Sequence, residues 1–187
     1  KYIDRSSSRP YIRLGIKACE EVIRLKIDHP KLDEVYYFLG VYYDELEDER
    51  NSLKYFTELT KRFADSPYIG EAYRALAEGE YNKSNFRQAL EYYKAASRNY
   101  KGAAYPRLLQ KMAWTYYRLR QYDRAISSMK EVISLSAKDE KFVNIKDEAL
   151  RDMAIFMTEG GRVNEALAYF KSVGGDKDFY PKTLATL

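Results

Sequence analysis

The feature that most constrains the fold is a repeat that occurs four times in the 187 residues. Segments 33–59, 70–96, 106–132 and 147–173 align over 27 positions without a gap. A short repeated segment cannot bury its apolar face alone, so stacked copies share a continuous core. The repeat therefore predicts an array of similar structural units.

The positions that the copies share have helical spacing. Positions 4 and 7 are apolar, positions 8 and 20 are small, and position 24 is bulky. In copy order they are Tyr36, Tyr73, Leu109 and Leu150; Leu39, Leu76, Met112 and Met153; Gly40, Ala77, Ala113 and Ala154; Ser52, Ala89, Ala125 and Ala166; and Phe56, Tyr93, Met129 and Phe170. Positions 4, 7 and 8 fall on one helix face, and positions 20 and 24 fall on a face of a second helix. Because a short polar turn separates them, each copy is predicted to be an antiparallel helix pair.

This pattern resembles the tetratricopeptide-repeat (TPR) family, whose 34-residue repeat has small and bulky apolar residues in the same order. The sequence departs from the family where Tyr or Leu replaces Trp at position 4, and where Glu80 replaces Tyr at position 11 of the second copy. The resemblance implies an all-α fold, a right-handed superhelical solenoid of helix-turn-helix repeats. It also implies a surface that binds proteins.

The chain divides on this reading into an N-terminal linker or partial helix and a TPR array. The linker covers 1–10 and the array covers 11–187. Within the array we expect a half repeat at 11–32, repeats at about 33–66, 70–103, 106–139 and 147–180, and the start of a further helix at 181–187. Because both ends of the array are partial repeats, we expect the chain to be a piece of a longer array, and the alternative is that these ends are native frayed caps.

The linker after the first repeat suggests a subtype. Residues 56–68 read F-x₂-L-x₃-F-x-D-S-P-Y, and Ala72 follows. This phrase is similar to bacterial cell-envelope TPR proteins of the YbgF type, from the Tol–Pal system, and of the BamD type, from outer-membrane assembly. Ala64 stands where that linker has a Pro. The resemblance implies a scaffold in the periplasm or at the outer membrane, and a cytoplasmic location is the alternative.

Charge and hydropathy restrict the class of partner. The net charge of +4 comes from 32 basic and 28 acidic residues whose signs are interleaved. Nucleic-acid binders usually concentrate basic residues on one face, so we expect no nucleic acid as a partner. The sequence contains no run of 18 apolar residues, so it predicts no membrane span. Whether a lipid anchor was removed from the chain is left open. The expected partner is a protein or peptide, and the oligomeric state is open.

Candidate chemical groups are few. His29 is the only histidine, and we interpret it as a surface residue near a helix C-terminus. The single cysteine, Cys19, is interpreted as a buried structural thiol. Two such residues cannot make a zinc site, which needs three or four ligands. Because the sequence also has no convergent catalytic constellation and no phosphate-binding Gly-rich loop, we expect no enzyme activity, no cofactor and no metal. The acidic run at 44–49 is interpreted as a solvated turn, with a docking patch for a basic partner as the alternative.

In the TPR family the first helix of each repeat lines a concave surface. The outward positions of these helices give the expected partner-binding residues, which are Tyr37, Val41, Arg74, Glu78, Tyr81, Gln110, Trp114, Tyr117, Arg118, Arg151 and Ile155. Later outward positions add Asp44, Glu45, Asn82, Thr158 and Glu159. Trp114 lies off the predicted packing face, beside Tyr81 of the neighbouring repeat, and Trp is common at interface hot spots. We therefore expect Trp114→Ala to weaken binding with little loss of fold. The alternative is that Trp114 packs against the preceding repeat or a linker.

Some TPR proteins clamp a peptide's C-terminal carboxylate with one Lys and two Asn. The corresponding positions here hold Tyr37, Val41 and Ala75, or Arg74, Glu78 and Lys111. We therefore expect no binding of tails that end in EEVD. The leading functional hypothesis is a non-catalytic protein-interaction scaffold, and the alternative is a structural spacer in a longer array. An accessory region of a larger enzyme is a third reading.

Overall fold

The computed structural model describes residues 8–26, 29–100, 104–137 and 143–174, and their regular structure is entirely α-helical. The helices are α1 (Arg9–Arg24), α2 (Leu32–Glu45), α3 (Glu49–Arg62), α4 (Ile69–Asn82), α5 (Phe86–Ser97), α6 (Tyr105–Arg118), α7 (Tyr122–Ser136), α8 (Val143–Glu159) and α9 (Val163–Gly174). The predicted all-α class is therefore confirmed.

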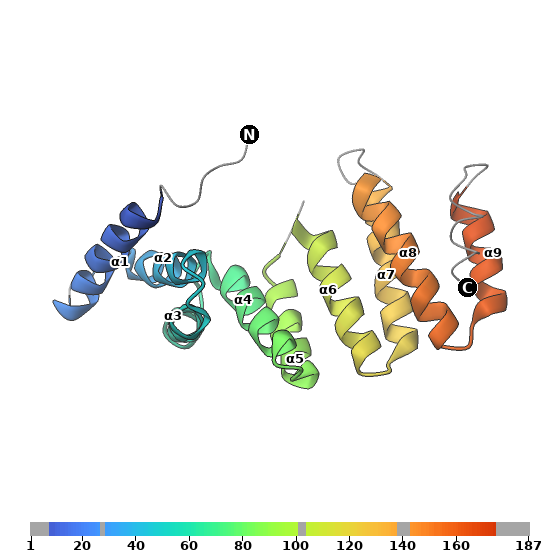
Figure 1. Cartoon of the computed structure of the whole chain (residues 1–187), viewed down its shortest axis with the longest axis horizontal. Helices are drawn as coiled ribbons and strands as arrows, with labels where there is room; N and C mark the ends of the chain where they lie inside the picture. Colours follow the sequence, from blue (N-terminus) through green and yellow to red (C-terminus); the bar gives the residue numbers. More distant parts are fainter. Residues whose placement is uncertain (1–7, 27–28, 101–103, 138–142, 175–187) are drawn as a thin grey trace. The chain divides into compact units, whose positions relative to one another are not determined.

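The chain divides into two compact units, each of which is described by itself. Unit 1 covers 1–99 and contains α1 to α5, and unit 2 covers 100–187 and contains α6 to α9. Within each unit every helix packs on the next one along the chain (Figure 1). The four expected helix pairs are α2 with α3 and α4 with α5 in unit 1, and α6 with α7 and α8 with α9 in unit 2.

The core of each unit is built from the positions that the repeat predicted. The residues at positions 7, 8, 20 and 24 are buried in all four copies. At position 4, Tyr36, Leu109 and Leu150 are buried, whereas Tyr73 is half-buried and its ring stacks on Tyr92 at 6.2 Å between centroids. Removing these apolar side chains from water is the main stabilising contribution to such a stack.

Small residues allow the paired helices to approach closely. A Cβ atom added to Gly40 would lie 2.6 Å from Cε1 of the Phe56 ring, much closer than carbon atoms approach one another. Gly40 is on α2 and Phe56 is on α3, so this contact joins the two helices of the first repeat. The small residue at position 8 is therefore a steric requirement.

The turn inside each helix pair has the same backbone conformation in all four repeats. Position 15 has positive φ in every copy, with values of 63° at Glu47, 62° at Ser84, 56° at Arg120 and 71° at Gly161. The amide of the following residue donates to a carbonyl five residues earlier, as Asp48 does to Tyr43. This is the hydrogen bond of a Schellman motif, which ends the first helix and reverses the chain. Only the fourth copy has glycine there, so residue type did not reveal the conformation.

The half repeat expected at 11–32 corresponds to α1, which begins at Arg9 and packs on α2. Glu20 on α1 accepts hydrogen bonds from the hydroxyls of Tyr43, at 2.7 Å, and Tyr55, at 3.0 Å. This three-residue cluster ties α1 to both helices of the first repeat. The further helix expected at 181–187 and the first seven residues of the chain lie outside the described residues.

Candidate functional site: a groove between α2 and α4

Unit 1 has a groove of about 340 Å³ between α2, α3 and α4, which we call the α2–α4 groove. It is lined by Tyr37, Val41, Asp44 and Glu45 from α2, Glu49, Ser52, Leu53 and Phe56 from α3, and Glu71, Arg74, Ala75, Glu78, Gly79 and Asn82 from α4. Its volume is within the range of pockets that hold small ligands or a few peptide residues.

Seven predicted outward residues come together in this groove, namely Tyr37, Val41, Asp44, Glu45, Arg74, Glu78 and Asn82. They lie on two helices whose outward faces both border it, as expected for the first helices of neighbouring repeats. Sequence reasoning missed the contribution of α3. Its Leu53 reaches the groove because Gly79 has no side chain, and a Cβ added to Gly79 would lie 2.7 Å from Cδ1 of Leu53.

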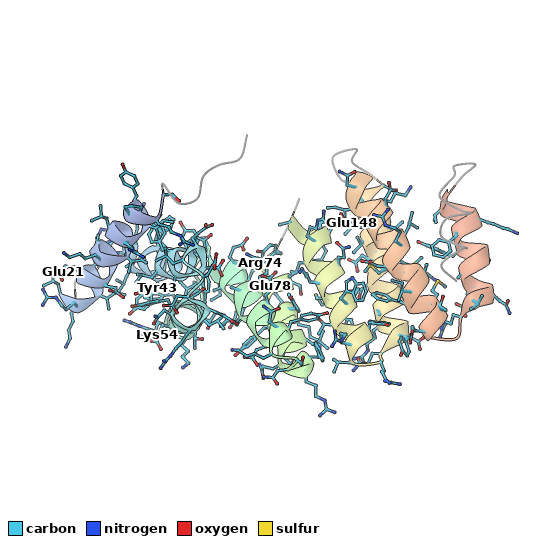
Figure 2. The ribbon with its side chains drawn as sticks, in the orientation of Figure 1. Glu21, Tyr43, Lys54, Arg74, Glu78 and Glu148 are labelled. Atoms are coloured by element: carbon cyan, nitrogen blue, oxygen red, sulfur yellow. The ribbon has the colours of Figure 1, made fainter. Side chains whose placement is uncertain are left out.

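Arg74 is the basic residue of the groove lining, and it is already engaged. Its Nε donates to Glu71 and its guanidinium Nη1 donates to Glu78, each at 2.9 Å. Figure 2 labels Arg74 and Glu78 on α4. Pairs three and four residues apart on a helix hold each other in place. Arg74 is therefore part of a fixed ion-pair network rather than an open cation for an acidic ligand.

Tyr37 provides an aromatic wall with a polar end. Its ring stacks on Tyr68, with 4.3 Å between centroids and 13° between planes. Burial raises the pKa of Tyr37, and the nearby Glu71 carboxylate adds to this effect. The phenol therefore stays neutral at physiological pH and keeps its proton as a hydrogen-bond donor.

One end of the groove is strongly acidic. Asp44 and Glu45 lie in the last turn of α2, which contains no basic residue, and Glu49 begins α3. Among the residues that the structure describes, none forms an ion pair with these three carboxylates. The C-terminal end of a helix carries partial negative charge, so α2 adds to their field.

Tyr81 is not among the residues that line the groove. Its ring makes an edge contact with Phe86, 5.2 Å between centroids, across the turn of its own repeat. Tyr81 lies in unit 1 and Trp114 lies in unit 2. Their expected proximity therefore stays a prediction.

In unit 2, the predicted residues of α6 contact α8, the first helix of the following repeat. Asp152 Oδ2 accepts from Trp114 Nε1 at 2.8 Å and from Gln110 Nε2 at 3.0 Å. The half-buried indole also meets the Phe156 ring edge-on at 5.0 Å. Tyr117 stacks on the same Phe156 ring at 4.8 Å.

These contacts give Trp114 a structural role that the sequence did not reveal. The alternative reading placed it against the preceding repeat or a linker, whereas its contacts are with the following helix. Asp152 and Phe156 are one helical turn apart on α8, but that spacing alone does not show which neighbouring residue they contact. Of the other predicted residues, Arg118 and Arg151 are exposed and Ile155 is 36% exposed.

The two chemically reactive side chains lie apart from the groove lining. Cys19 is partly buried, and burial raises the pKa of its thiol. His29 is exposed and lies just before α2, where its Nδ1 accepts a hydrogen bond from the amide of Lys31 at 3.1 Å. The expected position near a helix C-terminus is therefore wrong, because His29 precedes the N-terminus of α2. Within the described ranges, no three His, Cys, Asp or Glu residues are grouped as metal ligands. No described helix is both long and apolar enough to cross a bilayer.

Comparison with known proteins agrees with this geometry. The tetratricopeptide repeat family model matches residues 33–65 and 106–139, which correspond to the first and third expected repeats. Each described range contains helices, and helix pairs recur through both units. The chain has the TPR fold. No curated protein sequence matches the chain.

Several solved structures share this TPR fold. The MamA structure superimposes with a TM-score of 0.69 at 18% identity and covers 91% of this chain and 85% of its own. BtubC from P. vanneervenii has a TM-score of 0.72 at 16% identity, covering 98% and 74% respectively. TPR-like repeats from Podosopora anserina have a TM-score of 0.66 at 13% identity, covering 97% and 93%. These TM-scores show a common TPR fold, and identities this low show nothing about shared partners.

Proposed function

We propose that the chain is a non-catalytic protein-interaction scaffold that binds an extended segment of a partner protein in the α2–α4 groove. TPR repeats generally mediate protein–protein interaction, and the groove is the observation that supports this site. It combines apolar walls from Val41 and Leu53 with the carboxylates and hydroxyl that an extended chain needs for hydrogen bonding. The spacer hypothesis remains the alternative.

We further propose that the scaffold works in a bacterial cell-envelope assembly. The support for this context is the linker phrase at 56–68, which is similar to that of envelope TPR proteins. In the structure, Ser66 of this phrase donates to Asp33 Oδ2 at 2.7 Å, and its Oγ accepts the amide of Tyr68. The phrase therefore fixes the connection between α3 and α4, the two helices that border one side of the groove.

The test is selection of binders from a displayed library of random peptides, using the full chain as bait. Val41→Trp is the groove-filling variant, because Val41 is half-buried in the wall and its enlargement occupies the groove. Val163→Trp is the matched control, since Val163 is 40% exposed at the start of α9 in the other unit. We expect selected peptides to lose binding to Val41→Trp and to keep it with Val163→Trp.

If the selected peptides bind both variants as well as the original chain, the partner site is not the groove. If no peptide is enriched, the spacer hypothesis gains support. The envelope context is tested separately, by comparing proteins captured from envelope and cytosolic extracts of bacteria. Capture that depends on Val41 and comes only from the cytosolic extract would refute the proposed context.

A further inference from the structure

A buried hydroxyl distinguishes the first repeat from the other three. Position 20 holds Ala89, Ala125 and Ala166 in the later copies, whereas the first copy has Ser52. Ser52 is only 2% exposed and lines the α2–α4 groove. The described residues provide no hydrogen-bond partner for its hydroxyl, whose oxygen is not fully enclosed, since Ser136 Oγ is the fully buried side-chain oxygen without a partner in the described part of the chain. The groove therefore holds an unpaired polar group that a ligand could reach.

The charges around this hydroxyl indicate the sign of the ligand's charge. Asp44, Glu45 and Glu49 line the same groove without an ion pair to any described residue, and α2 directs its negative end there. Arg74 is occupied by Glu71 and Glu78. An acidic or C-terminal carboxylate ligand would thus meet repulsion, whereas a cation would be attracted.

The apolar lining specifies the shape of the cation. Val41 and Leu53 line the groove together with the Tyr37 ring. Lys and Arg side chains have apolar stems that pack on such surfaces while their charged ends reach polar groups. Aromatic rings also attract these cations over their faces. A free metal ion or a small amine would leave the apolar lining uncovered.

We propose that the α2–α4 groove binds a basic segment of a partner protein through a Lys or Arg side chain. The stem lies along Val41 and Leu53, and the charged end lies among Asp44, Glu45 and Glu49. One N–H of the charged end donates to the Ser52 hydroxyl, which supplies the missing partner. This inference rests on the proposed function and adds the chemical class of the ligand to it.

The test uses three fluorescein-labelled nonapeptides of Gly, Ser and Leu that differ only at two central positions, which are Lys, Gln or Glu. Binding to the full chain is measured by fluorescence anisotropy at low and high salt. We expect the Lys probe to bind about tenfold more tightly than the Gln probe, and more weakly at high salt. The Glu probe should bind most weakly.

Two variants locate the recognition. The double variant Asp44→Asn with Glu45→Gln should weaken binding of the Lys probe by about threefold to tenfold, because it removes two exposed carboxylates from the groove. Ser52→Ala should weaken it by about threefold or more through loss of one hydrogen bond to a charged group. Ala is present at the same position of the other repeats, so the fold should tolerate this change.

The matched control is Glu58→Gln with Asp65→Asn, which removes the same charge from unit 1 outside the groove lining. It should leave binding of the Lys probe unchanged, and circular dichroism checks that all variants are folded. Equal binding of the three probes, lost in Val41→Trp, would overturn the inference while the groove function stands. The inference would also be overturned if the Lys probe did not bind, or if its binding were unchanged both in Asp44→Asn with Glu45→Gln and in Ser52→Ala. The library selection then judges groove binding independently.

Discussion

Replacing Trp114 with alanine should destabilise unit 2 by about 3 kcal/mol, because the indole joins α6 to α8. Truncating a fully buried Trp costs about 3–5 kcal/mol, and Trp114 is half-buried, so its packing on Phe156 and Tyr117 contributes roughly 2 kcal/mol. The hydrogen bond from Nε1 to the Asp152 carboxylate adds about 1 kcal/mol, since its acceptor is charged but only partly buried.

The assay is urea unfolding followed by circular dichroism at 222 nm, because alanine removes the only tryptophan and with it the fluorescence signal. Trp114→Phe keeps an aromatic ring and removes the N–H donor, so it should cost about 1 kcal/mol. Asp152→Ala completes a double-mutant cycle, and the coupling energy between the two sites should be about 1 kcal/mol.

Tyr11→Ala is the control, since this side chain is 76% exposed and its loss should change the free energy of unfolding by less than about 0.5 kcal/mol. If the free energy of unfolding of the Trp114→Ala variant lay within about 0.5 kcal/mol of that of the original chain, the structural role assigned to Trp114 would be refuted. Binding measurements on this variant have to be read together with its stability. The expectation that it keeps its fold nearly intact does not follow from the structure.

Three further predictions concern unit 1 and one turn of unit 2. Gly40→Ala should destabilise the chain by about 1–3 kcal/mol in urea unfolding, because its Cβ would overlap the Phe56 ring; an unchanged midpoint would contradict the close approach. Gly161→Ala should cost about 1 kcal/mol by the same measurement, entirely from its positive φ of 71°, as nothing lies within 4 Å of the added Cβ. Burial, together with the hydrogen bond to Glu20, raises the pKa of Tyr43 to about 12, so the neutral phenol's contribution to stability should be complete below pH 10 and lost as the pH rises towards 12. Absorbance titration at 295 nm should show this pKa fall in Glu20→Gln, and no fall would contradict the role of the carboxylate.

The fold was predictable because its signal is repeated and local. Positions such as Leu39 and Ala77 are buried in the structure as their helical spacing required, since a face that repeats four times has to be covered by its neighbours. The turn conformation at Ser84 was not predictable from residue type. Its positive φ follows from the hydrogen bonds that close the helix pair, and these form with almost any side chain at that position.

The candidate site was predictable in part. The outward positions of α2 and α4 follow from helical periodicity, and the structure places Val41 and Glu78 on one groove as that periodicity indicated. The acidic run at 44–49 offered two readings, a solvated turn or a docking patch, and sequence alone could not separate them. The choice depends on which helix lies opposite, and that is a property of the packed units.

Sequence alone thus determined that the chain folds as TPR helix pairs, because periodic burial within about 30 residues is set by local helical geometry. Tertiary structure decided what each outward residue contacts. Trp114 and Arg74 occupy outward positions of the same kind, yet one bonds to Asp152 on the next repeat and the other is held within its own helix. The reason is that the contact of Trp114 with Asp152 joins residues far apart in the chain, whose proximity depends on the packing of whole helices, whereas the pairs of Arg74 lie within one helix.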